Sequence, residues 1–227
     1  IDVEYEILTP VTDASEAMSD QSPKIHESGN LLSTIEIKRG DCIKAEKQSE
    51  YVAKGTYKTQ RIEHAFMELE CCVAKPHGDE IEVFSQGQGV YEDRNSISKI
   101  LGIPLEKVKV SLMPNGGAFG GKEDISVQGH ASLFAHFLQL PVRVALTRPE
   151  SLLMHPKRHP MSMDMSMGCD NNGKLTFVKA DIIGDTGAYA SVGMKVLERA
   201  AGHATSVYTI PSVDILSRAV YTNNVPC

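Results

Sequence analysis

Asn-Gly-Gly-Ala-Phe-Gly-Gly-Lys-Glu, residues 115–123, is the stretch that decides how this sequence folds and what it binds. Four glycines surround one aromatic residue, Phe119, between an expected strand and an expected helix. Glycine adopts positive φ and lets a ligand approach the backbone closely. The N-terminus of a following helix adds free N–H groups and the positive end of its dipole. Because a plain turn needs one or two glycines, the pattern favours a bound anion or polar cofactor.

A nucleotide-binding loop is the competing interpretation of the same residues. Gly116, Gly121 and Lys122 match the GxxxxGK part of a phosphate-binding loop. That motif continues with Ser or Thr, whose hydroxyl holds magnesium, whereas this sequence has Glu123. A carboxylate at that position would repel phosphates, so nucleotide binding is not favoured.

Working outward from the turn, strand and helix patterns alternate along the chain. Asp-Asn-Asn-Gly at 170–173 has the composition of a hairpin turn, and four methionines alternate along 161–167. This mixture predicts an α+β (mixed α/β) fold, a sheet with packed helices, rather than a doubly wound sheet. Strands are expected at 51–57, 67–74, 80–84, 108–113, 141–146, 161–167, 175–184 and 213–221. Helices are expected at 90–101, where Gly102 follows, at 123–138 and at 196–204.

The N-terminal part has a different character. Residues 1–8 alternate apolar and polar side chains, which predicts a half-buried strand. Residues 9–31 are polar and turn-rich, with a short helical turn at 13–18. We therefore expect a strand and extended linker over 1–48 and a compact subdomain over 49–227 that is incomplete at its C-terminus. The chain starts without Met and stops after a strand-like run, which favours a piece of a longer protein.

Composition excludes several classes of protein. The 227 residues carry a net charge of -6, and 41% are hydrophobic. This supports a globular core and disfavours nucleic acid as a partner, because a phosphate-binding surface needs excess Lys and Arg. The five cysteines include no CxxC pair, which favours reduced thiols and a cytoplasmic location. No run is apolar enough to span a membrane.

With these segments in hand, the chain is similar to the molybdenum hydroxylases, the xanthine dehydrogenase and aldehyde oxidase family. Residues 116–123 resemble the family signature G-G-x-F-G-G-K-E, with Ala118 at position x, where a third successive glycine would stand. The resemblance covers about residues 50–227 and is weaker before them; Leu69 stands where the family often has Pro. Further similar segments, in the family's order and spacing, are 85–88, 99–104, 146–150, 158–160, 185–189 and 198–200.

The resemblance implies the first molybdopterin-binding half of a molybdenum hydroxylase large subunit. It implies a molybdenum–pyranopterin cofactor held without side-chain ligands to the metal, with [2Fe-2S] clusters and FAD on other parts or subunits. Such an enzyme hydroxylates an N-heterocycle or aldehyde with oxygen from water. A general-base Glu would belong to a later part of the subunit, so this chain alone is expected to be inactive.

The same resemblance assigns roles to individual residues. Gln88, with Gln86 as the alternative register, would donate a hydrogen bond to an oxygen of the metal, and Phe119 would lie beside it. Glu123 and Arg199 would bind the substrate as catalytic residues, which favours a purine such as xanthine or hypoxanthine. The ordinary alternatives are a surface Gln, a core Phe, a helix-capping Glu and a surface Arg. The remaining cofactor-binding candidates are Gly116, Gly117, Ala118 and Gly120.

Other interpretations remain open. A non-catalytic cofactor-binding or assembly protein, or an aldehyde or nicotinate hydroxylase, would share the scaffold. His155 and His159 are four residues apart, but the prolines that follow each of them disfavour a helical metal site, so structural or surface roles are expected. Expected partners are iron–sulfur and FAD subunits or domains, the remainder of the molybdenum subunit, a purine-like molecule and further copies of the holoenzyme, but neither nucleic acid nor membrane.

Overall fold

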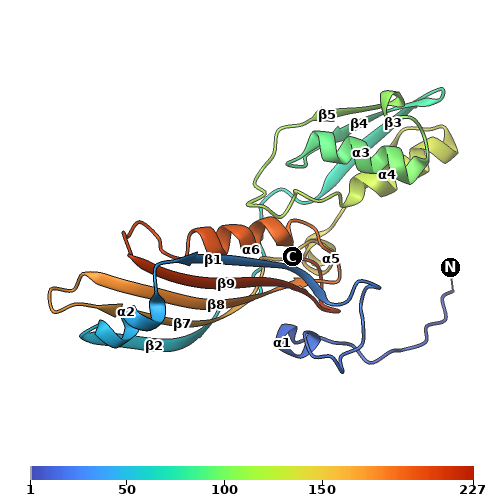
Figure 1. Cartoon of the computed structure of the whole chain (residues 1–227). Coiled ribbons are helices and arrows are strands. Elements are labelled where there is room, and N and C mark those ends of the chain that lie inside the picture. The colour runs from blue at the N-terminus through green and yellow to red at the C-terminus, as the bar shows by residue number, and fades with distance from the viewer. Residues whose placement is uncertain (1) are drawn as a thin grey trace. The chain divides into compact units, whose positions relative to one another are not determined.

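The computed structural model describes residues 2–227, which form two compact units (Figure 1). The first unit combines the residues up to Ile62 with His159–Cys227, and the second unit is Glu63–Arg158. The second unit is therefore inserted between two parts of the first. Its two ends are joined by an ion pair, in which Lys157 Nζ lies 2.6 Å from Glu63 Oε2.

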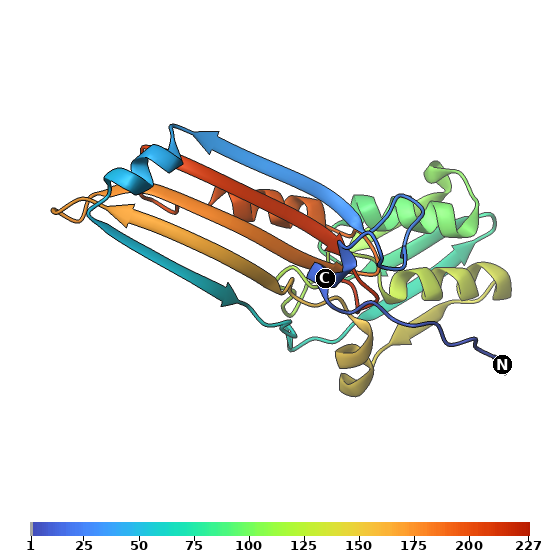
Figure 2. The same ribbon diagram turned by 60° about the horizontal axis from the view of Figure 1, so that its bottom comes forward.

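A five-stranded sheet forms the first unit, in the order β1-β9-β8-β7-β2, and Figure 2 shows these strands side by side. Only β8 and β9 pair in parallel within this sheet; the other pairs are antiparallel. The strands are β1 (Leu31–Arg39), β2 (Tyr51–Lys58), β7 (Met161–Cys169), β8 (Leu175–Gly187) and β9 (Ser212–Tyr221).

Helix α6 (Gly193–Gly202) covers one face of this sheet (Figure 1). Val178, Ile182 and Leu197 are buried together there. At Gly184 an added Cβ would lie 2.6 Å from Leu197 Cδ2, so only glycine lets the helix approach this closely. Two short helices, α1 (Ala14–Ala17) and α2 (Cys42–Gln48), complete the unit.

The second unit contains a four-stranded sheet in the order β5-β4-β3-β6, with β4 and β5 parallel. Its core lies between the sheet and the helices, where Val83, Ile97 and Ala131 are completely buried. The strands are β3 (Cys71–His77), β4 (Glu80–Ser85), β5 (Val108–Leu112) and β6 (Val142–Ala145). The helices are α3 (Val90–Leu101), the 3-10 turn η1 (Leu105–Lys107), α4 (Val127–Leu138) and α5 (Arg148–Met154).

Most expected elements, and the mixed α/β class, are confirmed. Helix α3 ends at Gly102, which adopts the left-handed φ of +65° that glycine allows. The 170–173 turn joins β7 to β8, with Asp170 N donating to Lys174 O. Of the four methionines of β7, three pack against the core of the first unit.

Several expectations are wrong. Ile1 lies outside the described residues, but residues 2–8 are exposed and form no strand, because alternation does not supply a partner strand. Residues 31–48, expected as linker, form β1 and α2 and belong to the first unit. The helix expected at 123–138 begins only at Val127. Residues 148–154, which lie outside the expected helices, form α5, and Thr147 and Glu150 cap its start reciprocally.

Two further expectations concern the cysteines and membrane-spanning helices. None of the five cysteines, all within residues 2–227, is in a disulfide. Over the same residues, no helix is both long enough and apolar enough to cross a membrane.

Candidate functional site

The glycine-rich turn follows β5 and carries backbone strain at its centre. Phe119 has a φ of +55°, a conformation that costs a non-glycine residue of order 1–3 kcal/mol. Its side chain is 75% exposed in this chain, so it does not belong to the core of the second unit. Residues with strained backbones cluster at functional sites, so the strain makes Phe119 a candidate for contact with a ligand.

Gln88 holds this turn through its side chain. Its Oε1 accepts hydrogen bonds from Gly120 N and from Lys122 N, each at 3.1 Å. Its backbone N donates to Lys122 O at 2.8 Å. The NH₂ group of the same amide has no hydrogen-bond partner within residues 2–227. The side chain is therefore fixed by its oxygen while its two N–H donors stay available to a ligand.

Gln86, the alternative to Gln88, is fully used inside the protein. It is 5% exposed, and its Nε2 donates to Leu69 O at 2.7 Å. Its Oε1 accepts from Lys122 Nζ at 2.5 Å. The backbone oxygen of Gln86 accepts from Asn115 Nδ2. Since both ends of its amide are satisfied, Gln86 has a structural role, and Gln88 is the residue that can contact a ligand.

Glu68, which sequence reasoning did not identify, contacts the start of the turn. Its Oε2 accepts from Gly116 N at 2.5 Å, and its own N donates to Gly116 O at 3.2 Å. An added Cβ at Gly116 would lie 2.6 Å from Glu68 Cβ. An added Cβ at Gly121 would lie 2.8 Å from His155 Nε2. Close packing therefore explains these two glycines without reference to a ligand.

Glu123 lies on the exposed end of this turn, close to the Gln88 segment. An added Cβ at Gly89 would lie 3.9 Å from Glu123 O. Helix α4 begins four residues later and has no acidic residue in its first turn, so Glu123 does not cap it. The expectation that the N-terminus of α4 supplies free N–H groups to the turn is also wrong.

Arg199 belongs to the first unit, where it lies exposed on α6. Its guanidinium makes no hydrogen bond or ion pair within residues 2–227. It lines a groove of about 690 Å³ beside β1. The other residues of this groove are Ile35, Ile37, Lys195, Glu198, Gly202 and His203.

The two histidines considered as metal ligands are buried in separate units. His155 is 1% exposed and lies 3.0 Å from His64 Nδ1 in the second unit. His159 is 5% exposed in the first unit, and burial lowers its pKa to about 4 despite the nearby Asp185 carboxylate. Residues 2–227 contain no group of three or more His, Cys, Asp or Glu side chains placed to hold a metal.

Lowering the pH should therefore destabilise the first unit. Between pH 6.5 and 4 an unfolded imidazole binds a proton while buried His159 does not, so the unfolded state is favoured as the pH falls. This effect reaches about 3 kcal/mol at most. Urea unfolding at pH 7 and pH 5 should show a smaller loss of unfolding free energy in His159→Gln than in the wild type. Equal losses in the two proteins would show that His159 is protonated in the folded state.

Residues 25–227 match the protein family described as the molybdopterin cofactor-binding domain. The chain belongs to this family. It is 36% identical to the nicotinate dehydrogenase large molybdopterin subunit of Eubacterium barkeri, over 99% of this chain and 53% of that protein. It is also 36% identical to a probable xanthine dehydrogenase subunit of Bacillus subtilis, over 99% of this chain and 30% of that protein. The chain thus spans about half of one relative and less than a third of the other.

Comparison of solved structures agrees on the fold of this molybdopterin cofactor-binding domain. The aldehyde oxidoreductase from Desulfovibrio gigas superposes with a TM-score of 0.94 at 23% sequence identity, covering 99% of this chain and 25% of that one. At this level of identity the likeness concerns the fold alone. All the candidate site residues lie inside the range that matches the family.

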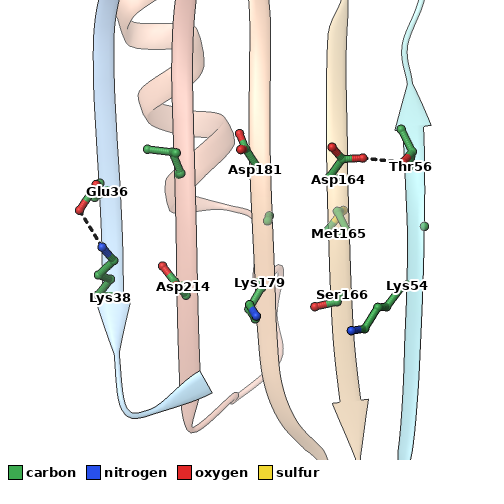
Figure 3. A pocket seen from close by; sticks show the side chains of 13 residues that line it. Glu36, Lys38, Lys54, Thr56, Asp164, Met165, Ser166, Lys179, Asp181 and Asp214 are labelled. Carbon is green, nitrogen blue, oxygen red and sulfur yellow. Dashed lines mark hydrogen bonds and ion pairs between the residues drawn. The ribbon is translucent and has the colours of Figure 1, made fainter. Parts of the chain in front are cut away.

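A further cavity of about 700 Å³ contains none of those candidates. It lies on the face of the first unit's sheet opposite α6, where charged side chains alternate across the strands (Figure 3). Lys38 pairs with Glu36, and Lys54 and Lys179 both pair with Glu46 of α2. Since these lysines are compensated by neighbouring carboxylates, we interpret this face as a solvated surface of the sheet.

Proposed function

We propose that this chain forms one wall of the active site of a molybdenum hydroxylase that acts on an N-heterocycle. The observation that carries the proposal is the amide of Gln88, whose oxygen is fixed on the glycine-rich turn and whose N–H donors are available beside exposed Phe119. Such a pre-set donor is what an anionic or oxo-bearing cofactor requires. The family of the chain supports the same proposal, as does its similarity to a nicotinate dehydrogenase subunit and a probable xanthine dehydrogenase subunit.

The residues of the turn fit a molybdenum–pyranopterin cofactor. The backbone of 116–120 would contact it, Phe119 would pack against it, and Gln88 would donate to one of its oxygens. When bound, this group supplies the oxygen-transfer and redox chemistry. The protein's part is to orient the group, to exclude water and to place hydrogen-bond donors. A helix N-terminus takes no part here, because α4 begins beyond the turn.

Glu123 and Arg199 would orient the substrate. A carboxyl group can bond ring nitrogens, and a guanidinium can stabilise negative charge that develops on a ring oxygen. This pair favours an oxo-purine over a plain aldehyde, which offers fewer groups to bind. A carboxylated pyridine is the second candidate substrate, since one of the relatives is a nicotinate dehydrogenase.

The remaining parts of the proposed enzyme would lie elsewhere. The rest of the molybdenum subunit would supply the general base and the opposite wall of the site. Iron–sulfur clusters and FAD on other domains or subunits would take the electrons away, in an oligomeric holoenzyme. From the cysteine pattern, we also propose a cytoplasmic location for this enzyme.

Arg199→Met in the intact enzyme should lower kcat/KM for hypoxanthine by about tenfold to a hundredfold, the effect of losing a charged hydrogen bond. Glu123→Gln should likewise impair hypoxanthine more than a simple aldehyde. Lys195→Met is the matched control, since Lys195 lies on the same helix and lines the same groove. Steady-state kinetics with both substrates would decide, and full hypoxanthine activity in both variants would remove this pair from the site.

A further inference from the structure

Both ends of the glycine-rich turn are held by one residue, Glu68. At the first end, its carboxylate accepts from Gly116 N and its backbone N donates to Gly116 O. At the other end, its backbone oxygen accepts from Lys122 Nζ at 2.8 Å. The turn from Gly116 to Lys122 is therefore closed onto a single position that is 48 residues away from Gly116 in the sequence.

Lys122 is well placed to act as the second anchor. It is only 4% exposed, and its ammonium also donates to Gln86 Oε1 and lies 4.3 Å from the centre of the Phe66 ring. Burial lowers the pKa of Lys122, while the carboxylates of Glu68 and Glu70 oppose this effect. A buried ammonium without its hydrogen-bond partners would be costly, which ties the end of the turn firmly to Glu68 and Gln86.

The strained centre of the turn needs such support. Phe119 cannot hold its own conformation, because its side chain is exposed and packs little. Inside the turn, a bond from Gly121 N to Ala118 O, 2.8 Å long, spans this residue. Strained backbone persists only where the surroundings over-determine it. Together with Gln88, the two anchors on Glu68 provide that surrounding structure.

We propose that Glu68 is a positioning residue of this site, which holds the two ends of the glycine-rich turn and so maintains the conformation of Phe119 before the cofactor binds. The proposal rests on the function proposed above for the turn. Glu68 acts through the backbone of Gly116 and the side chain of Lys122, and no contact between Glu68 and substrate is required.

Hydrogen–deuterium exchange of the intact enzyme, prepared without cofactor, tests the proposal directly. In Glu68→Ala, exchange of the Gly116 amide should accelerate about tenfold, as expected when a hydrogen bond to a charged group is lost. Exchange of the amides of residues 117–121 should also accelerate as the turn loosens, although the backbone oxygen of residue 68 still accepts from Lys122 Nζ. Glu68→Gln keeps an acceptor for Gly116 N and should restore slow exchange. Met67→Ala is the control, because this neighbouring side chain is 91% exposed. In every variant the thermal midpoint should stay close to that of the wild type.

Elemental analysis after cofactor loading gives the second readout. Molybdenum content should fall in Glu68→Ala and recover in Glu68→Gln. Unchanged exchange and unchanged molybdenum in Glu68→Ala would overturn the proposal, as would a Glu68→Gln variant no better than Glu68→Ala. If Glu68→Ala does not fold, Glu68→Asp, which withdraws the carboxylate by one methylene, must show the same local acceleration. A wild-type enzyme that never takes up molybdenum would refute the proposed function. The exchange measurements would still test the role of Glu68 in that case.

Discussion

Replacing Gln88 by Glu in the intact enzyme should lower kcat by about a hundredfold or more, while the fold and the glycine-rich turn stay unchanged. A glutamate keeps an oxygen that can accept from Gly120 N and Lys122 N. It loses both N–H donors and places a negative charge toward the cofactor. Removal of a single pre-set donor from an active site typically costs about 10²–10³ in kcat. Steady-state kinetics with hypoxanthine, together with molybdenum analysis, would measure the effect.

A second variant separates the two functions of this amide. Gln88→Ala removes the acceptor as well as the donors, so it should also loosen the turn and lower molybdenum content. If Gln88→Glu retained normal kcat, the free N–H donors would have no catalytic part. If Gln88→Ala retained a rigid turn, the two bonds to Gly120 and Lys122 would be dispensable.

Phe119→Ala should produce the other large effect, a loss of bound molybdenum of tenfold or more with little change in stability. The side chain is 75% exposed, so removing it leaves no cavity in the chain itself. An aromatic ring that packs against a cofactor contributes about 2 kcal/mol through buried apolar area. Elemental analysis and thermal unfolding, measured on the same preparations, would separate cofactor loss from unfolding.

Phe119→Gly sharpens this experiment. Glycine adopts the φ of +55° without strain, so this variant should unfold at a temperature equal to or above that of Phe119→Ala. Both variants should lose molybdenum to a similar extent. A large fall in thermal stability with normal molybdenum content would mean that Phe119 supports the fold rather than the cofactor.

Much of the fold is encoded in short-range signals. The hairpin between β7 and β8 was predictable from the alternating methionines and Asp170–Gly173, and α3 from its spacing and Gly102. Helix α5 was missed although its capping residues, Thr147 and Glu150, are visible in the sequence. Pro149 lies in the first turn of this helix, where proline is tolerated. At residues 2–8 a strand was expected but none forms. Alternating apolar and polar residues do not by themselves provide the neighbouring strand that a sheet requires.

The candidate site was predictable only where a motif carried it. Gln88 and Phe119 followed from the resemblance, in which the register of the segment ending at 101–104 favours Gln88 over Gln86. The structure adds that the amide of Gln86 is satisfied within the protein. Glu68 escaped notice because its bonds to Gly116 and Lys122 join segments 48 and 54 residues apart. No periodicity or local spacing encodes such long-range hydrogen bonds. Glu123 was wrongly placed at the start of a helix. The helical spacing of apolar residues already begins at Ile125, whereas helix α4 itself begins at Val127.

The insertion of the second unit between β2 and β7 has a consequence for how the chain reaches its native state. These strands are hydrogen-bonded neighbours, and Lys58 pairs with Ser162 across the whole intervening segment. Closing so long a loop from an unfolded chain is entropically costly and slow. If Glu63–Arg158 folds first, the ion pair between Glu63 and Lys157 brings its ends together, and the long loop becomes in effect a short hairpin. The folded second unit would then hold the end of β2 near the start of β7. Replacing this unit by a short turn should leave β2 and β7 able to pair.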